Sequence, residues 1–457
     1  MKNGLFIFRR DLRIYDNNAL YNACKECDKV FCCFIFTPEQ ITNKNDFKSS
    51  NAIQFMIESL KELSYEFNKL NSKLYLLYGD NNKVIYELID KLNIQSLYYN
   101  RDYTPYALLR DHKIKELCNN NNINCSEFQD YYLYEPGTIL TGSNTYYKKF
   151  TPFYMKALKI EVDKPIYINK QKLSVKFVAL KYSTSFNEMS IHYKFNENTL
   201  VNGGRTNGLK QLKETIKTQK NYDQMRNTLA HNTSLLSAYI KFGCISIREV
   251  YYFVRINFGI NSELMRQLVW RDFYAQVLFA YPYVLDPKNN KITWNKNKIY
   301  LERWYLGKTG FPVIDACMRQ LNETGWMHNR GRLITACFFI KTLLLDWREG
   351  EKYFAKNLID YDVANNNGNW QWLSGTGVDT MPYFRTFNPW TQSKKYDPDA
   401  LFIKRWIPEL KDVDAKDIHN WNIEYTNTKY ASVKYERPVV DFSEQRIKSI
   451  ELYKQFL

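Results

Sequence analysis

GWMHNRGRLITACFFI, at residues 325–340, and ANNNGNWQW, at residues 364–372, decide how the C-terminal half of the chain folds. In the first stretch Leu333, Cys337 and Ile340 recur at the spacing of one helix face, which predicts that this face is buried. Polar side chains interrupt the pattern here and further along: Asn329, Arg330, Arg332, Asp360, Asp362 and Asn366. Buried polar groups are costly unless they are paired. The pattern therefore predicts a helical core that encloses either a polar ligand or a dense internal network.

The first 130 residues alternate between apolar strand patterns and helical patterns. The strand patterns, which read as buried parallel strands, cover residues 4–8, 30–36, 73–79 and 95–99. Helical patterns between them cover about residues 49–69, 81–93 and 104–121. This alternation predicts a doubly wound parallel sheet with helices on both of its faces.

A length of 457 residues suits two domains. We expect an α/β domain over residues 1–132 and an all-α domain over residues 205–457, where the periodicity is helical. Residues 133–204, which include the turn-rich run PGTILTGSN, are expected to form an interdomain connector. Further on, HNTSLLSAYIKFG (231–243) predicts a helix capped by Asn232 or Thr233, and a helix N-terminus favours phosphate groups.

The composition points to a polyanionic partner and a reducing compartment. The net charge is +16, which suits nucleic acid or, equally, an anionic membrane surface. The nine Cys residues include one CxxC but no second pair at metal-ligand spacing, so we expect reduced thiols and no metal site. No signal peptide and no apolar run of transmembrane length is seen. These features predict an intracellular protein, cytoplasmic or nuclear according to its host, without a membrane span.

The two opening stretches resemble the class I DNA photolyases and cryptochromes. TGVDTMPYFRTFNP (376–389) and RRDLRIYDNNAL (9–20) resemble further motifs of that family, in the family's order and across nearly the whole chain. The resemblance implies that the helical domain binds FAD, active in its reduced anionic form. It also implies that the partner is UV-damaged DNA, single- or double-stranded, and that the protein acts as a monomer.

The resemblance also implies which residues hold the flavin. These are Tyr222, Thr233, Ser234, Leu236, Ser237, Arg271, Trp326, Arg332, Asp360, Asp362 and Asn366. Arg332 and Asp360 would form a buried pair beside the ring, Asp362 would meet its polar edge and Asn366 would face its N5. Seen alone, the two aspartates are more typical of a loop of acidic turn residues.

A second implied set would bind the damaged bases. It consists of Gln267, Trp270, Asn329, Arg330, Leu333 and Trp372. Gln267 resembles the (6-4) photolyases, because cyclobutane dimer enzymes usually carry Glu at this place. Asn329 and Leu333, however, stand where the (6-4) branch carries His. We therefore expect light-driven repair of cyclobutane pyrimidine dimers, with a (6-4) photolyase or a cryptochrome-type photoreceptor as the alternatives.

Two further features follow from the resemblance. Trp370, Trp347 and Trp294 match the family's electron wire, although each tryptophan alone is more typical of core packing. Asp102 and Lys241 match members with an 8-hydroxy-deazaflavin antenna. Tyr106 and Ala107 replace the Asn–Glu pair of members that bind methenyltetrahydrofolate, so we favour the deazaflavin type. A flavin antenna or an empty pocket is the alternative.

Overall fold

The computed structural model describes residues 1–174, 178–285 and 292–455. Its sheet has five parallel strands in the order β3-β2-β1-β4-β5. The strands are β1 (Asn3–Phe8), β2 (Lys29–Phe36), β3 (Leu74–Tyr78), β4 (Ser96–Asn100) and β5 (Asn124–Phe128). The first four confirm the predicted strands. The sequence analysis missed β5, because this edge strand reads NCSEF and lacks an apolar run.

Helices cover both faces of the sheet, as predicted, because alternate side chains of each strand point to opposite faces. They are α1 (Asn18–Glu26), α3 (Ser50–Lys69), α4 (Asn81–Leu92) and α5 (Pro105–Asn120). Phe6 and Phe8 of β1 belong to one core, which includes α1 and α3. Leu5 and Ile7 belong to another, which includes α4 and α5.

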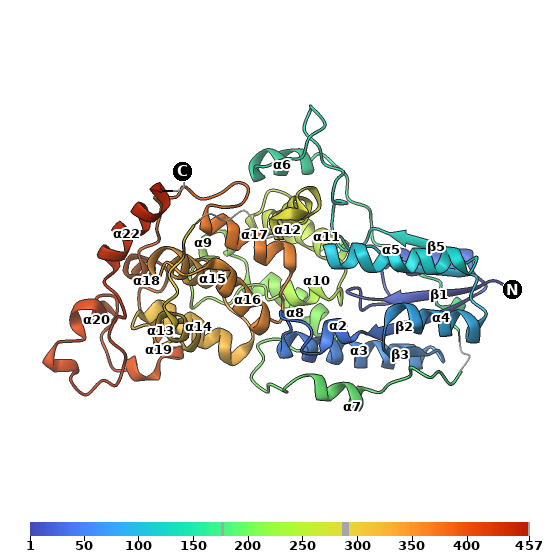
Figure 1. The fold of residues 1–457 in the computed structure, drawn as a ribbon, viewed down its shortest axis with the longest axis horizontal. Coiled ribbons are helices and arrows are strands. Elements are labelled where there is room, and N and C mark those ends of the chain that lie inside the picture. Colours follow the sequence, from blue (N-terminus) through green and yellow to red (C-terminus); the bar gives the residue numbers. More distant parts are fainter. Residues whose placement is uncertain (175–177, 286–291, 456–457) are drawn as a thin grey trace.

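The rest of the chain is mainly helical (Figure 1). Its longer helices are α6 (Phe150–Ala157), α8 (Arg205–Thr218), α11 (Ile247–Phe258), α12 (Glu263–Ala280), α13 (Lys298–Leu306), α14 (Pro312–Thr324), α15 (Asn329–Cys337), α16 (Trp347–Asn357), α17 (Val363–Ser374), α18 (Pro389–Tyr396) and α22 (Phe442–Lys454). In Figure 1 the sheet occupies one end of an elongated molecule, and the helices from α13 onward build the other end. A π-helical turn, Phe338–Thr342, continues α15.

One helix start was predicted wrongly. The helix expected to follow Asn232 or Thr233 is α10 (Ser237–Lys241), and its N-cap is Leu236. Leu235 has a φ of 53°, in the left-handed region that interrupts a right-handed helix. Residues 232–236 therefore form a loop that leads into α10, and Asn232 and Thr233 do not cap a helix.

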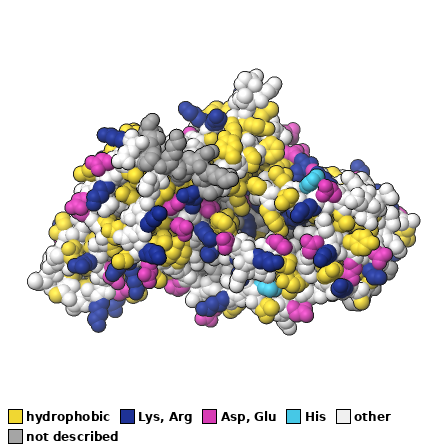
Figure 2. All heavy atoms as spheres, in the orientation of Figure 1, with side chains coloured by type: hydrophobic (Ala, Val, Ile, Leu, Met, Phe, Trp, Pro, Cys, Tyr) yellow, Lys and Arg dark blue, Asp and Glu magenta, His cyan; other side chains and the backbone are white. Residues whose placement is uncertain are grey.

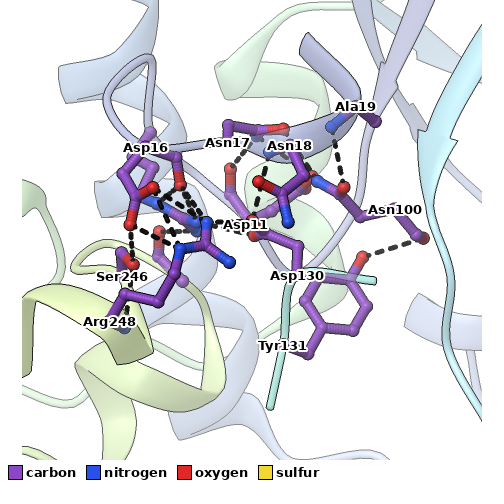
Figure 3. A network of polar contacts seen from close by, with 12 residues as sticks. Asp11, Asp16, Asn17, Asn18, Ala19, Asn100, Asp130, Tyr131, Ser246 and Arg248 are labelled. Carbon is purple, nitrogen blue, oxygen red and sulfur yellow. Dashed lines mark hydrogen bonds and ion pairs between the residues drawn. The ribbon is translucent and has the colours of Figure 1, made fainter. Parts of the chain in front are cut away.

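The loop after β1 docks the sheet onto the helices through a buried ionic cluster (Figure 3). Arg13 contacts Asp130 at 2.6 Å. Arg248 of α11 contacts Asp130 at 2.7 Å and Asp16 at 2.9 Å. These four side chains, which we call the docking cluster, are each at most 4% exposed. Burying these charges costs hydration free energy, which only their mutual ion pairs can offset. The cluster therefore keeps the sheet and the helices in contact.

Within the described residues, no helix has the length and apolar character that crossing a bilayer requires.

Candidate flavin and DNA site

The centre of the site is an ion pair between two helical segments. Arg332 of α15 lies with Nη2 2.9 Å from Oδ2 of Asp360, in the loop before α17. Ser237, the first residue of α10, donates its hydroxyl to the same oxygen at 2.6 Å. Arg332 is oriented by a second hydrogen bond, from Nε to the carbonyl of Met327 at 2.9 Å. Residues far apart in the sequence thus meet as the resemblance implies.

Buried atoms of several charged side chains in this region have no hydrogen-bond partner among the described residues, and two of them belong to the predicted flavin set. Asp360 Oδ1 and Arg271 Nη2 are buried and make no hydrogen bond to any residue that the structure describes. Arg271, on α12, uses Nη1 to donate to the carbonyl of Tyr131 at 2.7 Å. A buried charged group without a hydrogen-bond partner loses its hydration and gains no interaction that compensates for it, which costs free energy. The arrangement therefore suits a ligand that carries both donors and acceptors.

Asp362 lies on the side of the site that faces the sheet. It is the N-cap of α17, and its Oδ2 is 3.0 Å from Nη2 of Arg10. Burial alone would raise the pKa of Asp362, but the cations Arg10 and Arg271 lower it to about 2. Asp362 is therefore an anion at neutral pH. The sequence analysis missed Arg10 as its partner, although this arginine lies in the quoted RRDLR motif.

Asn366 has a protein partner that the sequence did not indicate. Its side-chain amide donates to Oε1 of Glu351 at 3.1 Å and to the Glu351 carbonyl at 3.2 Å. Burial raises the pKa of Glu351 to about 7, although the bond from Asn366 opposes this. Asn366 is thus held in place from α16.

The remaining residues of the predicted flavin set belong to α9, to the loop before α10 and to the segment before α15. Tyr222, in the short helix α9 (Tyr222–Met225), is half-buried. Thr233 and Ser234 lie half-buried in the loop before α10, where Gln211 donates to the Ser234 carbonyl at 3.0 Å. Leu236 and Trp326 are buried, with 2% and 7% exposure. This loop, rather than a helix N-terminus, supplies the hydroxyl groups.

Trp270, from the predicted DNA set, has one face covered. Phe150, the first residue of α6, stacks on it with ring centroids 3.6 Å apart and planes at 6°. Asp379 accepts a hydrogen bond from the backbone N–H of Phe150 at 3.1 Å, which fixes the start of that helix. No sequence signal had indicated Phe150, since the partners are 120 residues apart. Trp270 itself remains half-buried.

The other members of the DNA set are partly accessible. Asn329 is exposed, and Gln267, Leu333 and Trp372 are half-buried. Arg330 donates from Nη2 to Oδ1 of Asn227 at 2.6 Å, and its guanidinium lies 4.5 Å from the ring centre of Tyr396. On the face drawn in Figure 2, Lys and Arg side chains are spread widely and mixed with acidic ones. The positive charge of the chain therefore does not form one compact patch on that face.

The three predicted wire tryptophans are all buried in the helical core. Trp370, Trp347 and Trp294 are 2%, 6% and 8% exposed. The indole N–H groups of Trp347 and Trp294 have no acceptor among the described residues. The ring of Trp294 meets Tyr453 of α22, with centroids 6.3 Å apart.

A large cavity lies between the sheet and the helices. Its volume is about 810 Å³, within the range of small-molecule sites. Arg10, Asp102 and Lys241 line it, together with Trp347 and Asp362. Burial and nearby Arg10 lower the pKa of Lys241 to about 7, against the opposing effect of the carboxylates around it. The two residues predicted for an antenna, Asp102 and Lys241, thus line one cavity. Arg10 lies between two carboxylates there, with Nη1 3.6 Å from Oδ2 of Asp102 and Nη2 3.0 Å from Oδ2 of Asp362.

Fold and site together define a two-part protein, with a helical half that carries a cluster of buried polar groups and a sheet that faces a large cavity. Residues 5–168 match the family model described as DNA photolyase. Residues 264–455 match the model described as the FAD binding domain of DNA photolyase. The chain belongs to the DNA photolyase family, as the sequence analysis predicted.

Individual relatives agree over the full length. The deoxyribodipyrimidine photo-lyase of Buchnera aphidicola subsp. Acyrthosiphon pisum is 36% identical, over 100% of this chain and 97% of its own. The archaeal photolyase from Sulfolobus tokodaii with two FAD molecules is 39% identical, covers 99% of this chain and 100% of its own, and has a TM-score of 0.88. A Synechocystis cryptochrome is 28% identical over 99% of both chains, with a TM-score of 0.91.

FAD fits the residues of the helical site. Its diphosphate accepts hydrogen bonds, as the free Arg271 Nη2 requires, and its ring carries an N–H that the free Asp360 Oδ1 can accept. These two unpartnered atoms make the fit specific to a ligand with both kinds of group.

Proposed function

We propose that this protein is a deoxyribodipyrimidine photo-lyase that repairs cyclobutane pyrimidine dimers in DNA. When bound, reduced FAD would supply one electron to the dimer under light; the two cross-bonds would break, and the electron would return to the cofactor. The observation that carries the proposal is the Arg332–Asp360–Ser237 cluster with an unpartnered carboxylate oxygen, inside the segment that matches the FAD-binding model. Photo-lyase relatives of at least 31% identity along nearly the whole chain support the choice of lesion.

When bound, FAD would supply the electron. The protein would hold the cofactor in place and stabilise the negative charge of its reduced form. Asp360 would accept a hydrogen bond from the ring while Arg332 balances its charge, and Arg271 would donate to the cofactor. Asp362 stays anionic because Arg10 and Arg271 lie beside it. Tyr222, Thr233, Ser234, Leu236, Trp326 and Asn366 would complete the site.

The lesion must leave the helix stack to reach the cofactor. Flipping a base costs a few kcal/mol, and less for a damaged pair. Stacking on Trp270 and Trp372 would offset this cost by about 1–3 kcal/mol per base. Gln267, Asn329 and Arg330 would supply hydrogen bonds, and Leu333 an apolar contact. Phe150 would keep the Trp270 ring in position through its stacked face.

The cavity beside the sheet would take a second, light-collecting chromophore. Arg10 supplies positive charge there, Lys241 a hydrogen-bond donor and Asp102 an acceptor, a combination that suits an anionic ring system. We favour an 8-hydroxy-deazaflavin, with FAD as the alternative because the Sulfolobus tokodaii photolyase carries two FAD molecules. Mass spectrometry of the chromophores released from the native protein would distinguish the two.

A repair assay tests the main proposal. The reduced protein is mixed with oligonucleotides that carry either a cyclobutane dimer or a (6-4) product, and is illuminated with blue light. We expect restored bases from the cyclobutane dimer alone. Repair of only the (6-4) product would support the reading that Gln267 suggested and overturn the lesion choice. Failure to repair either would favour a cryptochrome-type photoreceptor, to which the Synechocystis structure is similar.

A further inference from the structure

A lysine lies fully buried in the helical core, in contact with a carbonyl and an aromatic ring. Lys341 belongs to the π-helical turn Phe338–Thr342 and has 0% exposure. Its Nζ donates to the carbonyl of Tyr383 at 3.3 Å and lies 3.3 Å from the ring centre of Tyr453. Lysine is almost never buried this completely unless it is paired, and π-helical turns are frequent at functional sites. Both contacts of this lysine therefore need an account.

The groups around the lysine hold one segment, residues 375–388, which we call the α17–α18 loop. The carbonyl that accepts from the lysine lies in the middle of this loop. At its start, the Tyr453 hydroxyl donates to the carbonyl of Ser374, the last residue of α17, at 2.8 Å. Near its end, the backbone N–H of Phe387 donates to Sγ of Cys337 at 3.4 Å. The core thus holds the loop at three points.

The α17–α18 loop borders the predicted DNA set on two sides. The backbone N–H of Met381 donates to the carbonyl of Trp372 at 3.1 Å. Burial lowers the pKa of Arg330, and the charge of Arg385 lowers it further, so these two arginines lie near each other. Phe384 is 58% exposed and Arg385 is also exposed. The backbone of the loop therefore fixes side chains at the surface where DNA is predicted to bind.

We propose that Lys341 is a positioning residue, which holds the α17–α18 loop against the lesion site and thereby favours damaged over undamaged DNA. The proposal rests on the proposed function, because the cyclobutane dimer is the ligand whose binding the loop would support. Lys341 acts through Tyr383 and Tyr453. A charged N–H donor forms a stronger hydrogen bond than a neutral one. A cation over a ring face adds attraction, which is largest where water is excluded.

The charge of Lys341 can be removed by a modest rise in pH. Burial lowers the pKa of Lys341 to about 8, against the opposing effect of Cys337. Burial raises the pKa of Cys337 to about 11 and that of Tyr453 above its usual range, so neither group titrates near 8. The charge of Arg385 also lies near Cys337. Above a pH of about 8, Lys341 therefore loses its attraction to the Tyr453 ring, and the loop is held less firmly.

The test measures how well the FAD-loaded protein distinguishes damaged DNA. Fluorescence anisotropy gives the Kd for an oligonucleotide with one cyclobutane dimer and for the undamaged oligonucleotide, and we call their ratio the dimer preference. We expect Lys341→Met to lower it roughly 10-fold, the effect of one hydrogen bond to a charged group. The matched control is Thr342→Val, in the same turn, because Thr342 is equally buried and its hydroxyl has no partner among the described residues. Equal dimer preference in the two variants would overturn the proposal.

A pH series on the native protein needs no variant and so does not depend on the folding of Lys341→Met. We expect the native dimer preference to fall between about pH 7 and pH 9. Over the same range, hydrogen exchange at the amides of Met381 and Phe387, corrected for the intrinsic rate, should become faster. Lys341→Met should show neither change. A native dimer preference that stays constant, or one that falls equally in Lys341→Met, contradicts the role of Lys341. A native protein without any dimer preference would instead overturn the proposed function.

Discussion

The docking cluster and the candidate flavin site are both buried ionic groups. They differ in whether the protein itself pairs all of their buried polar atoms, and we call a group closed when it does and open when it does not. In the docking cluster, no fully buried side-chain nitrogen or oxygen of Arg13, Asp16, Asp130 or Arg248 is left unpaired by the described part of the chain. In the flavin site, Asp360 Oδ1 and Arg271 Nη2 are left over. The difference indicates two uses of buried charge. A closed group joins two parts of a protein, whereas an open one is completed by a ligand.

The largest effect should come from opening the closed cluster. Arg248→Leu removes the cation that contacts Asp16 and Asp130 and leaves both carboxylates buried. Removing one partner of a buried ion pair lowers the free energy of unfolding by about 3–5 kcal/mol. We expect denaturant unfolding to show a loss of this size. The control is Arg255→Leu, since Arg255 is exposed on the same helix and its loss should cost at most about 0.5 kcal/mol. Equal losses in both variants would mean that the cluster does not hold the fold.

Changing the open site should affect ligand binding more than folding. Asp360→Asn removes the negative charge that balances Arg332. With its remaining oxygen toward Arg332 and Ser237, the asparagine places an NH2 donor where the free acceptor Oδ1 stood. A hydrogen bond to a charged group contributes about 1.5–3 kcal/mol, or roughly 10- to 100-fold in affinity. We expect the Kd for FAD, measured by flavin fluorescence, to rise by that factor. An unchanged Kd together with a large loss of stability would make Asp360 a second docking residue.

The cavity beside the sheet should give a pH-dependent stability of its own. The pKa of Lys241 is lowered from 10.5 to about 7 in the folded protein, because of burial and of Arg10. Between these two values the unfolded chain binds the extra proton, so the free energy of unfolding should rise with pH. Asp102, Asp360 and Asp362 also face Lys241 and raise its pKa, but the effects of burial and of Arg10 outweigh theirs. In thermal unfolding of Lys241→Met, the melting temperature should not show this rise with pH. Equal pH dependence of the melting temperature in the native protein and in Lys241→Met would contradict the prediction.

The smallest effect should come from the support of Trp270. Phe150→Leu removes a stacked pair, which contributes about 0.5–1.5 kcal/mol beyond its buried area. We expect the affinity for a dimer-containing oligonucleotide to fall by roughly 2- to 10-fold in a fluorescence anisotropy titration. Phe153→Leu is the control, because Phe153 is as buried on the same helix but contacts Phe273 rather than Trp270. A similar loss in both variants would reduce Phe150 to a core residue.

Local patterns predicted the elements whose burial is periodic. The apolar runs of β1 to β4 and the helices α3, α4 and α5 lie where the sequence indicated, because packing and propensity agree there. The edge strand β5 was missed because half-exposed strands need no apolar run. The helix start near Asn232 was wrong because a left-handed Leu235 leaves no local signal.

One contact of the candidate site was predicted from the sequence, and two others were not. The resemblance named Arg332 and Asp360, which the structure brings into contact. It did not name Arg10, which reaches Asp362 across 352 positions of sequence. Nor did it give Phe150 as the partner of Trp270. Such contacts depend on how two segments that are distant in the sequence pack against each other. The hydrophobic periodicity within either segment does not predict this packing.

The central claim is that the open ionic group of the helical core is completed by FAD, and its most direct test is thermal unfolding at increasing FAD concentration. A ligand that binds only the folded protein should stabilise it by about 2.7 kcal/mol at a hundredfold excess over Kd. We predict a melting temperature that climbs steadily with FAD in the native protein and much less in Asp360→Asn. A melting temperature that does not change with FAD in the native protein would contradict the claim.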